Sequence, residues 1–314
     1  MSIADALSDQ GTGPIVAVEH LSKQFPAPGK ARLHAVEQVS LHVERGETLA
    51  VVGESGCGKS TLAYLIMRLL EPSSGTIRLD GVDITGLSQR ALRPHRRKAQ
   101  IVFQDPFASL DPRRQVGKAI GEPLEIHRTA PAPEIKDIVA GLLRRVGMSP
   151  DDMVRYPHQF SGGQRQRICI ARALALRPDL VIADEAVSAL DVSIQAQVIN
   201  LMMDLQDELG LSYLFISHDL AVVERIAHRV AVMYLGQIVE LGPRHAVFEH
   251  PQHSYTRRLL DAVPIADPRR RRTDRSVSTD EVPSPLYGPG TAPEPAVLYE
   301  VAPGHFVASE HTQG

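Results

Sequence analysis

The stretch "ETLAVVGESGCGKST" (47–61) joins a continuous apolar run to a loop of glycines, one lysine and hydroxyl side chains. A Val/Leu run without alternation predicts a strand that is buried on both faces. The loop fits the pattern G-x-x-x-x-G-K-[ST], and the helical spacing of "TLAYLIMRLLE" (61–71) supplies the helix that must follow it. The stretch therefore predicts a phosphate-binding loop between a buried strand and a helix.

Each residue type in this loop suits a polyphosphate ligand. Glycines let successive amides point at phosphate oxygens, aided by the N-terminus of the helix. We expect Lys59 to reach the β- and γ-phosphates and Ser60 to hold Mg²⁺. The predicted ligand is a nucleoside triphosphate with Mg²⁺. The candidate nucleotide-binding residues of the loop are Gly53, Ser55, Gly56, Gly58, Lys59, Ser60 and Thr61.

A second apolar run, "LVIADE" (180–185), ends in two acids. We expect Asp184 to bind Mg²⁺, directly or through water, and Glu185 to orient or deprotonate the attacking water. Open α/β sheets bind ligands at the carboxyl ends of their strands, so an acid pair there indicates a reaction site. A phosphate loop with such acids also occurs in small-molecule kinases, GTPases and recombinase-type motors, and all of these alternatives stay open at this point.

The segment "FSGGQRQRICIARAL" (160–174) discriminates among these classes. Ser161 is a natural N-cap, and the two glycines after it leave amides free at the start of an amphipathic helix. The segment therefore predicts a second anion-binding helix terminus, about twenty residues before the acid pair.

The order of the remaining patterns predicts an α/β fold. The run 35–43 alternates and suggests a half-exposed antiparallel strand, whereas the region from about 105 to 160 reads as helices broken at "TAPAP". Later strands alternate with helices, which implies a largely parallel, doubly wound sheet. The further expected elements are strands at 15–21, 179–184 and 212–217, helices at 163–176, 193–209 and 220–227, and a hairpin at 229–242.

Composition excludes several classes of protein. The 314 residues carry a formal net charge of −3, which argues against a nucleic-acid protein that depends on a strong positive field. Two cysteines without CxxC spacing suggest neither a disulfide framework nor a metal site, so a reducing cytosol is expected. We see no secretory signal and no apolar stretch of membrane-spanning length. Residues 1–14 are expected to be a loose leader, and a basic linker with weakly ordered sequence is expected after about 266.

Together these motifs resemble the nucleotide-binding subunits of ABC transporters. The resemblance implies that "SGGQ" is the signature motif, which contacts the γ-phosphate of ATP held by the other subunit of a head-to-tail dimer. Gln104 in "IVFQDP" is similar to the glutamine that senses Mg²⁺ and water, and His218 in "ISHD" to the switch histidine. Phe25 sits where the family places an aromatic to stack on adenine, although a core Phe is a competing interpretation. The resemblance thus adds as nucleotide-binding, catalytic or metal candidates Phe25, Gln104, Ser161, Gly162, Gly163, Gln164, Asp191 (in "SALD") and His218.

The resemblance covers residues 15 to about 265 and narrows toward the oligopeptide/dipeptide/nickel importer branch. The phrases that carry this are "QDPFASLDPR", "YPHQFSGGQRQR", "SALDVSIQAQV" and "HPQHSYTRRLLDAVP" (250–264). Ala186 departs from the proline usual after the glutamate, but it removes no catalytic group. The tail lacks the cysteine cluster of some relatives, so no iron–sulfur site is expected.

The resemblance implies an ABC ATPase fold: a P-loop NTPase core with an antiparallel β subdomain and a helical subdomain (about 105–160) within residues 15–243. Residues 244–314 would form a peptide-importer-type C-terminal extension with a partly disordered tail. The implied function is ATP hydrolysis coupled to peptide import at the cytoplasmic face of the plasma membrane. Its partners would be a second ATPase subunit (identical or paralogous), two permease subunits and an extracytoplasmic solute-binding protein, with no nucleic acid.

Two rival functions remain. A soluble ABC-type ATPase acting on nucleic acid or ribosomes usually carries two cassettes, long coiled-coil arms or zinc inserts, and the sequence shows one cassette, no sustained heptads and no metal cysteines. A metabolic P-loop kinase leaves the SGGQ, SALD and histidine motifs unexplained together.

Overall fold

The computed structural model describes residues 13–262, 286–288 and 291–309. Its strands are β1 (Val16–Pro26), β2 (Arg32–Val43), β3 (Thr48–Val52), β4 (Ser74–Leu79), β5 (Val82–Asp83), β6 (Ala99–Val102), β7 (Leu180–Asp184), β8 (Ser212–Ser217), β9 (Arg229–Tyr234), β10 (Gln237–Pro243), β11 (Leu286–Tyr287), β12 (Leu298–Ala302) and β13 (His305–Ala308). Its helices are η2 (Pro28–Lys30), α1 (Lys59–Ile66), α2 (Gln89–Leu92), α3 (His95–Lys98), α4 (Pro106–Ser109), α5 (Val116–His127), α6 (Ala132–Arg145), η3 (Pro150–Val154), η4 (Pro157–Gln159), α7 (Gly162–Leu174), α8 (Val192–Leu209), α9 (Leu220–Ile226), α10 (Arg244–Glu249) and α11 (Ser254–Asp261).

The central sheet of the described residues has the order β12-β13-β10-β9-β3-β8-β7-β6. Strands β9, β3, β8, β7 and β6 pair in parallel, and β10, β13 and β12 continue the sheet antiparallel. The prediction of a largely parallel sheet is confirmed, as is the hairpin formed by β9 and β10. Every residue of β3, β7 and β8 is buried, which is what an apolar run without alternation predicts.

Side chains alternate along the central strands and divide the core into two layers. On β3, Ala50 and Val52 belong to the layer that includes the helices α5 to α9. Leu49 and Val51 point the other way, into the layer formed with α1 and the antiparallel strands. Because the central strands are packed on both faces, their carboxyl ends are held in fixed positions. The candidate site lies at the carboxyl ends of these strands.

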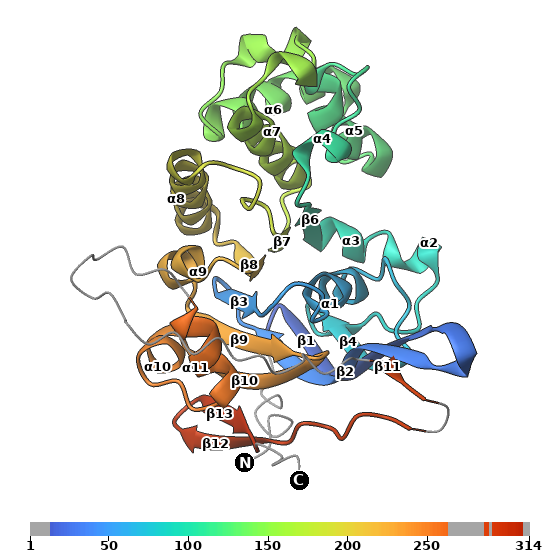
Figure 1. Cartoon of the computed structure of the whole chain (residues 1–314). Coiled ribbons are helices and arrows are strands. Elements are labelled where there is room, and N and C mark those ends of the chain that lie inside the picture. Colours follow the sequence, from blue (N-terminus) through green and yellow to red (C-terminus); the bar gives the residue numbers. More distant parts are fainter. Residues whose placement is uncertain (1–12, 263–285, 289–290, 310–314) are drawn as a thin grey trace, which may run out of the picture.

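A second sheet, with the order β11-β2-β1-β4-β5, is antiparallel throughout its described strands. The alternating burial of β2 confirms the half-exposed antiparallel strand expected at 35–43. Figure 1 shows this sheet on the side of the central sheet away from α5, α6 and α7.

The region expected to be helical contains α4, α5 and α6 with the short helices η3 and η4, and α5 ends at His127, just before "TAPAP". Helix α7 packs against α5, α6 and α4, and these helices group at one end of the molecule (Figure 1). Their shared core contains Ile120, Leu143 and Ile168, all fully buried.

The C-terminal extension folds back onto both sheets. Strand β13 pairs with β10, and β11 adds to β2 through Leu286 and Tyr287. At these strands the structure differs from the weakly ordered sequence expected after 266, because cross-strand pairs such as Leu298 with Ala308 join this part of the tail to a sheet. The expected leader and basic linker fall largely within 1–12 and 263–285, outside the described residues.

Candidate nucleotide site

The carboxyl ends of four parallel strands bring the predicted residues together. The glycine-rich loop follows β3, Gln104 comes two residues after β6, Glu185 follows β7 and His218 follows β8. Because β3, β8, β7 and β6 are neighbours in this order, side chains far apart in sequence meet at one edge of the sheet.

Two glycines of the loop are required by close backbone contacts. A Cβ on Gly53 would lie 2.2 Å from the carbonyl oxygen of Met233, and one on Gly58 would lie 2.1 Å from that of Ala35. Both residues also have positive φ, +152° and +108°. Lys59 is 4% exposed, and its Nζ donates to the carbonyl oxygens of Gly53 (2.7 Å) and Glu54 (2.8 Å). The ammonium group is thus held inside the loop at the start of α1.

The hydroxyl of Ser60 and the carboxylate of Asp184 form a pair of oxygen groups at the base of this loop. Ser60 Oγ donates to Asp184 Oδ1 at 2.9 Å. Burial raises the pKa of Asp184, while hydrogen bonds from Ser60 and Tyr64 oppose that rise. Burial makes the ionised form of a carboxyl group costly, but a bound cation stabilises that form. Oxygen ligands such as this carboxylate and hydroxyl suit Mg²⁺. The donor set therefore fits the predicted metal.

Glu185 lies between Gln104 and His218. Gln104 Nε2 donates to Glu185 Oε2 at 2.8 Å, and His218 Nδ1 lies 3.4 Å from Glu185 Oε1. Glu185 itself has φ of +47°, an uncommon conformation for a residue with a side chain. The Glu185 amide donates to the carbonyl oxygen of Ile216, which holds this conformation in place. Strain of this kind, stored at a strand end, is a frequent feature of reaction sites.

A cavity of about 340 Å³ opens over the loop. Among the predicted residues, its lining contains Phe25, Ser55, Gly56, Gly58, Lys59, Ser60, Thr61, Gln104 and Glu185. Phe25 is partly exposed, and the Lys23 ammonium lies 5.1 Å from its ring centroid. The competing interpretation of Phe25 as a core residue is therefore not supported by its burial.

Sequence reasoning missed another wall of this cavity, which is formed by Leu33, His34, Ala35 and Gly236. The Gly236 amide donates to the carbonyl oxygen of Cys57, and Gly236 O accepts from the amide of Glu37. The turn of the β9–β10 hairpin thus joins the loop to β2. The glycine in "MYLGQIV" (233–239) was the only local signal for this contact, and it indicates no more than a turn.

The predicted signature residues do not line this cavity. Ser161 caps α7: its hydroxyl accepts from the Gln164 amide at 3.3 Å, and the Gln164 side chain accepts from the Ser161 amide at 3.0 Å. Both residues are exposed. Gly163 is buried, and a Cβ there would lie 2.3 Å from Ile194 Cγ2. The N-terminus of α7 therefore presents its polar groups to the surface, away from the phosphate loop of its own chain.

Asp191 is exposed and caps α8, where its carboxylate accepts from the Ile194 amide (3.0 Å) and the Ser193 hydroxyl (2.7 Å). These bonds lower the pKa of Asp191, with the amide of Ile194 as the largest cause. Asp191 is thus fixed on the surface at the start of α8 and does not line the cavity.

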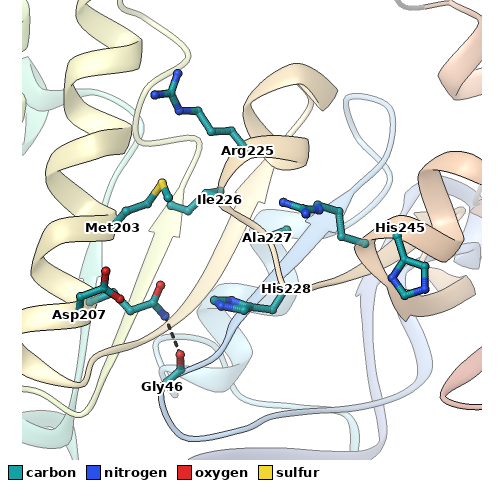
Figure 2. Close-up of a pocket in the computed structure, with 10 residues that line it drawn as sticks. Gly46, Met203, Asp207, Arg225, Ile226, Ala227, His228 and His245 are labelled. Atoms are coloured by element: carbon teal, nitrogen blue, oxygen red, sulfur yellow. Dashed lines mark hydrogen bonds between the residues drawn. The ribbon is translucent and has the colours of Figure 1, made fainter.

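Figure 2 shows another cavity, of about 440 Å³, between α8, α9 and α10. Its basic side chains do not converge: Arg225 and His245 point away from one another (Figure 2). Arg225 donates to Asn200 Oδ1, Arg244 to the carbonyl oxygen of Glu224, and His228 Nδ1 accepts from the Thr48 amide. This cavity therefore lacks the convergent donors of a phosphate site.

The phosphate loop, the acid pair at the end of β7 and the separate helix α7, which Ser161 caps, define an ATP-binding cassette of the P-loop class. The chain belongs to the ABC transporter family. The family model described as "ABC transporter" matches residues 36–188, and the model described as "Oligopeptide/dipeptide transporter, C-terminal region" matches residues 239–289.

Among curated proteins, the chain is similar to the glutathione import ATP-binding protein GsiA of Pectobacterium atrosepticum, with 56% identity over 307 residues that cover 96% of this chain and 49% of the relative. GsiA of Escherichia coli O1:K1 / APEC is 54% identical over 306 residues, which again cover 96% of this chain and 49% of the relative. The chain thus spans about half the length of the curated relatives it matches.

Among solved structures, cbiO1 from Clostridium perfringens, part of the ABC transporter complex cbiONQ, superposes with a TM-score of 0.68 at 30% identity, covering 76% of this chain and 91% of that one. The ATP-binding cassette MJ0796, dimeric and bound to ADP and Pi, gives a TM-score of 0.66 at 26% identity, covering 73% of this chain and 98% of that one. These comparisons confirm the ABC ATPase fold expected from the sequence.

Proposed function

We propose that this chain is the ATP-hydrolysing subunit of an ABC importer for small peptides. The observation that carries the proposal is the contact of Glu185 with both Gln104 and His218, beside a phosphate loop whose lysine is buried. A carboxylate held from two sides at the mouth of a polyphosphate cavity is suited to orient a water molecule for attack on the γ-phosphate.

In the proposed mechanism the chain mainly positions groups and stabilises charge. Loop amides and Lys59 bind the β- and γ-phosphates, and Phe25 at the cavity wall stacks on the base. Glu185 accepts a proton from the attacking water, and Gln104 holds this carboxylate in place. His218 donates to the γ-phosphate oxygens from the end of β8.

Ser60, Asp184 and Gln104 are the residues that would hold Mg²⁺. The ion would supply positive charge that neutralises the phosphate oxygens of the nucleotide. No group of three or more His, Cys, Asp or Glu side chains that could cage a metal occurs among the described residues. That is in keeping with Mg²⁺, which uses one or two carboxylates together with substrate phosphates and water.

The exposed N-terminus of α7 supports a composite site between two subunits. In the free chain, Ser161 to Gln164 cap their own helix at the surface and do not line the cavity. A second cassette, identical or paralogous, would place its own SGGQ segment against the γ-phosphate, with Asp191 at the contact between the subunits. ATP would close this dimer and hydrolysis would open it.

Peptide import is supported by the C-terminal match and by the relatives named for glutathione import. No helix in the described part of the chain is long and apolar enough to span a membrane. We therefore propose attachment to the cytoplasmic face of the plasma membrane through two permease subunits, with an extracytoplasmic solute-binding protein delivering the peptide. Action on nucleic acid or ribosomes is the less favoured function, because no observation on the described residues supports it.

The test compares wild type with Lys59→Ala. Removal of the buried ammonium group should weaken MgATP binding by about 10- to 100-fold, since hydrogen bonds to charged groups contribute about 1.5–3 kcal/mol. Phosphate release should fall with it. Lys98→Ala, which removes a surface lysine paired with Asp80, is the matched control and should leave both unchanged. Equal MgATP affinity in Lys59→Ala and wild type would refute the nucleotide site. Reconstitution with the permeases, with glutathione as the first peptide probe, tests transport.

A further inference from the structure

A tyrosine of the C-terminal extension touches the phosphate loop. Tyr255 lies on α11, 201 positions after Glu54, and its hydroxyl oxygen accepts a hydrogen bond from the Glu54 amide at 2.9 Å. The side chain is 2% exposed, and its ring lies against that of Tyr234 with centroids 4.2 Å apart. Burial raises the pKa of Tyr255, so the phenol stays neutral at physiological pH.

The hydrogen bond acts on the peptide unit that also holds the lysine of the loop. The carbonyl of Gly53 and the amide of Glu54 belong to one peptide group, and this group is trans. Its oxygen accepts from Lys59 Nζ at 2.7 Å, and its N–H donates to Tyr255 at 2.9 Å. The two polar ends of this peptide point in opposite directions, so Lys59 and Tyr255 hold it from opposite sides.

Tyr255 is itself fixed to the central sheet. Its amide donates to His253 Nδ1, the cap of α11. The amides of Gln252 and His253 donate to the two oxygens of Glu240, a fully buried carboxylate on β10 that also contacts His305 Nε2 at 2.8 Å. Because these bonds anchor the start of α11, the hydroxyl of Tyr255 is a rigid support for the loop.

We propose that Tyr255 is a positioning residue for nucleotide binding: through the Glu54 amide it fixes the Gly53–Glu54 peptide, and so the Gly53 carbonyl oxygen, one of the two that accept hydrogen bonds from Lys59. The proposal depends on the nucleotide site proposed above. It gives the C-terminal extension a direct part in the ATPase, in addition to any role in transport.

The physical consequence is preorganisation of the loop. Without the Tyr255 hydroxyl, the peptide has a free N–H and the loop populates other conformations, which reduces the fraction ready to bind phosphate. A hydrogen bond of ordinary strength then corresponds to an affinity about three- to tenfold weaker. Once nucleotide is bound, the phosphates themselves order the loop, so the chemical step should change little.

The experiment measures the Kd of MgATP and of MgADP by calorimetry, and KM and kcat for hydrolysis, in Tyr255→Phe. We expect both Kd values and KM to rise about three- to tenfold, with kcat within about twofold of wild type. The matched control is Tyr213→Phe, in which a tyrosine of β8 with 1% exposure loses the hydrogen bond that its hydroxyl donates to the backbone oxygen of Met202 on α8. Tyr213→Phe should lose comparable stability and keep wild-type affinity.

Wild-type affinity in Tyr255→Phe would overturn the proposal, as would an equal loss in Tyr213→Phe, which would reflect general loosening of the fold. Lys59→Ala distinguishes a failure of the proposed role of Tyr255 from a failure of the proposed nucleotide site. If Lys59→Ala loses nucleotide and Tyr255→Phe does not, only the role of Tyr255 fails. If Lys59→Ala binds normally, the nucleotide site itself fails.

Discussion

Gln104 donates a hydrogen bond to the carboxylate of Glu185 at 2.8 Å, across 81 positions of sequence and between the ends of β6 and β7. Gln104 also directly precedes the helical region that begins at α4. One side chain therefore connects the proposed catalytic carboxylate to the start of the helical region.

Replacement of Gln104 by alanine should slow hydrolysis by about tenfold to a hundredfold, because Glu185 loses a partner that sets its position. MgATP affinity should change much less, since Lys59 and the loop amides remain. Gln100→Ala is a suitable control: Gln100 lies on β6, four positions before Gln104, and its side chain donates to the backbone oxygens of Arg96 and Ala99. The measurement is the kcat and KM of ATP hydrolysis in the two variants, and equal kcat values would argue against a role for Gln104.

A negative charge introduced at Gly162 tests whether the SGGQ segment acts on ATP bound by the other subunit. A Cβ at Gly162 meets only Leu190 Cδ2, at an ordinary 3.5 Å, whereas Gly163 is too tightly packed for a clean test. In Gly162→Asp the new carboxylate suits its own helix N-terminus but repels a γ-phosphate placed there. We expect normal ATP binding by the single chain and loss of hydrolysis, with much milder effects in Gly162→Asn, which differs only in charge. Loss of ATP binding by the monomer of Gly162→Asp would place the signature in the chain's own site.

The raised pKa of Asp184 predicts a pH-dependent gain of stability in Asp184→Asn. A carboxyl whose pKa is raised by folding stabilises the fold at low pH, and this contribution is lost as the pH rises through the folded-state pKa. Without metal or nucleotide, Asp184→Asn should therefore exceed wild type in free energy of unfolding at pH 8 and match it more closely at pH 4, while Mg²⁺-dependent ATP binding falls. Urea denaturation at both pH values measures this. Asp179→Asn, at an exposed carboxylate just before β7, should show no such gain.

Much of this site could be predicted from the sequence because its residues sit in local patterns. The loop from Gly53 to Thr61 follows a buried strand, and the pair Asp184–Glu185 lies at the end of another. Parallel strands bring their carboxyl ends to one edge of the sheet. The order of the strands cannot be read from such patterns, yet it is what brings Gln104 to Glu185.

The missed contacts depend on long-range packing. Nothing near Tyr255 or His34 signals a phosphate loop, because their neighbours Glu54 and Gly236 are about 200 positions away in sequence. The strands of the tail were missed for a related reason: β12 and β13 are short, and they are ordered by pairing with one another and, through β13, with the distant strand β10.

The measurement that tests the central claim most directly is the mass of Glu185→Gln in solution with MgATP, by light scattering after gel filtration. Glutamine keeps the shape of Glu185 and can still accept the hydrogen bond from Gln104, but it cannot take a proton from water, so hydrolysis should fall by about 10²- to 10⁴-fold. The variant, mixed with its cognate subunit where the transporter uses two different ones, should accumulate as a dimer with ATP and return to monomer with ADP. A monomer that binds ATP and hydrolyses it at a near-normal rate would contradict the account.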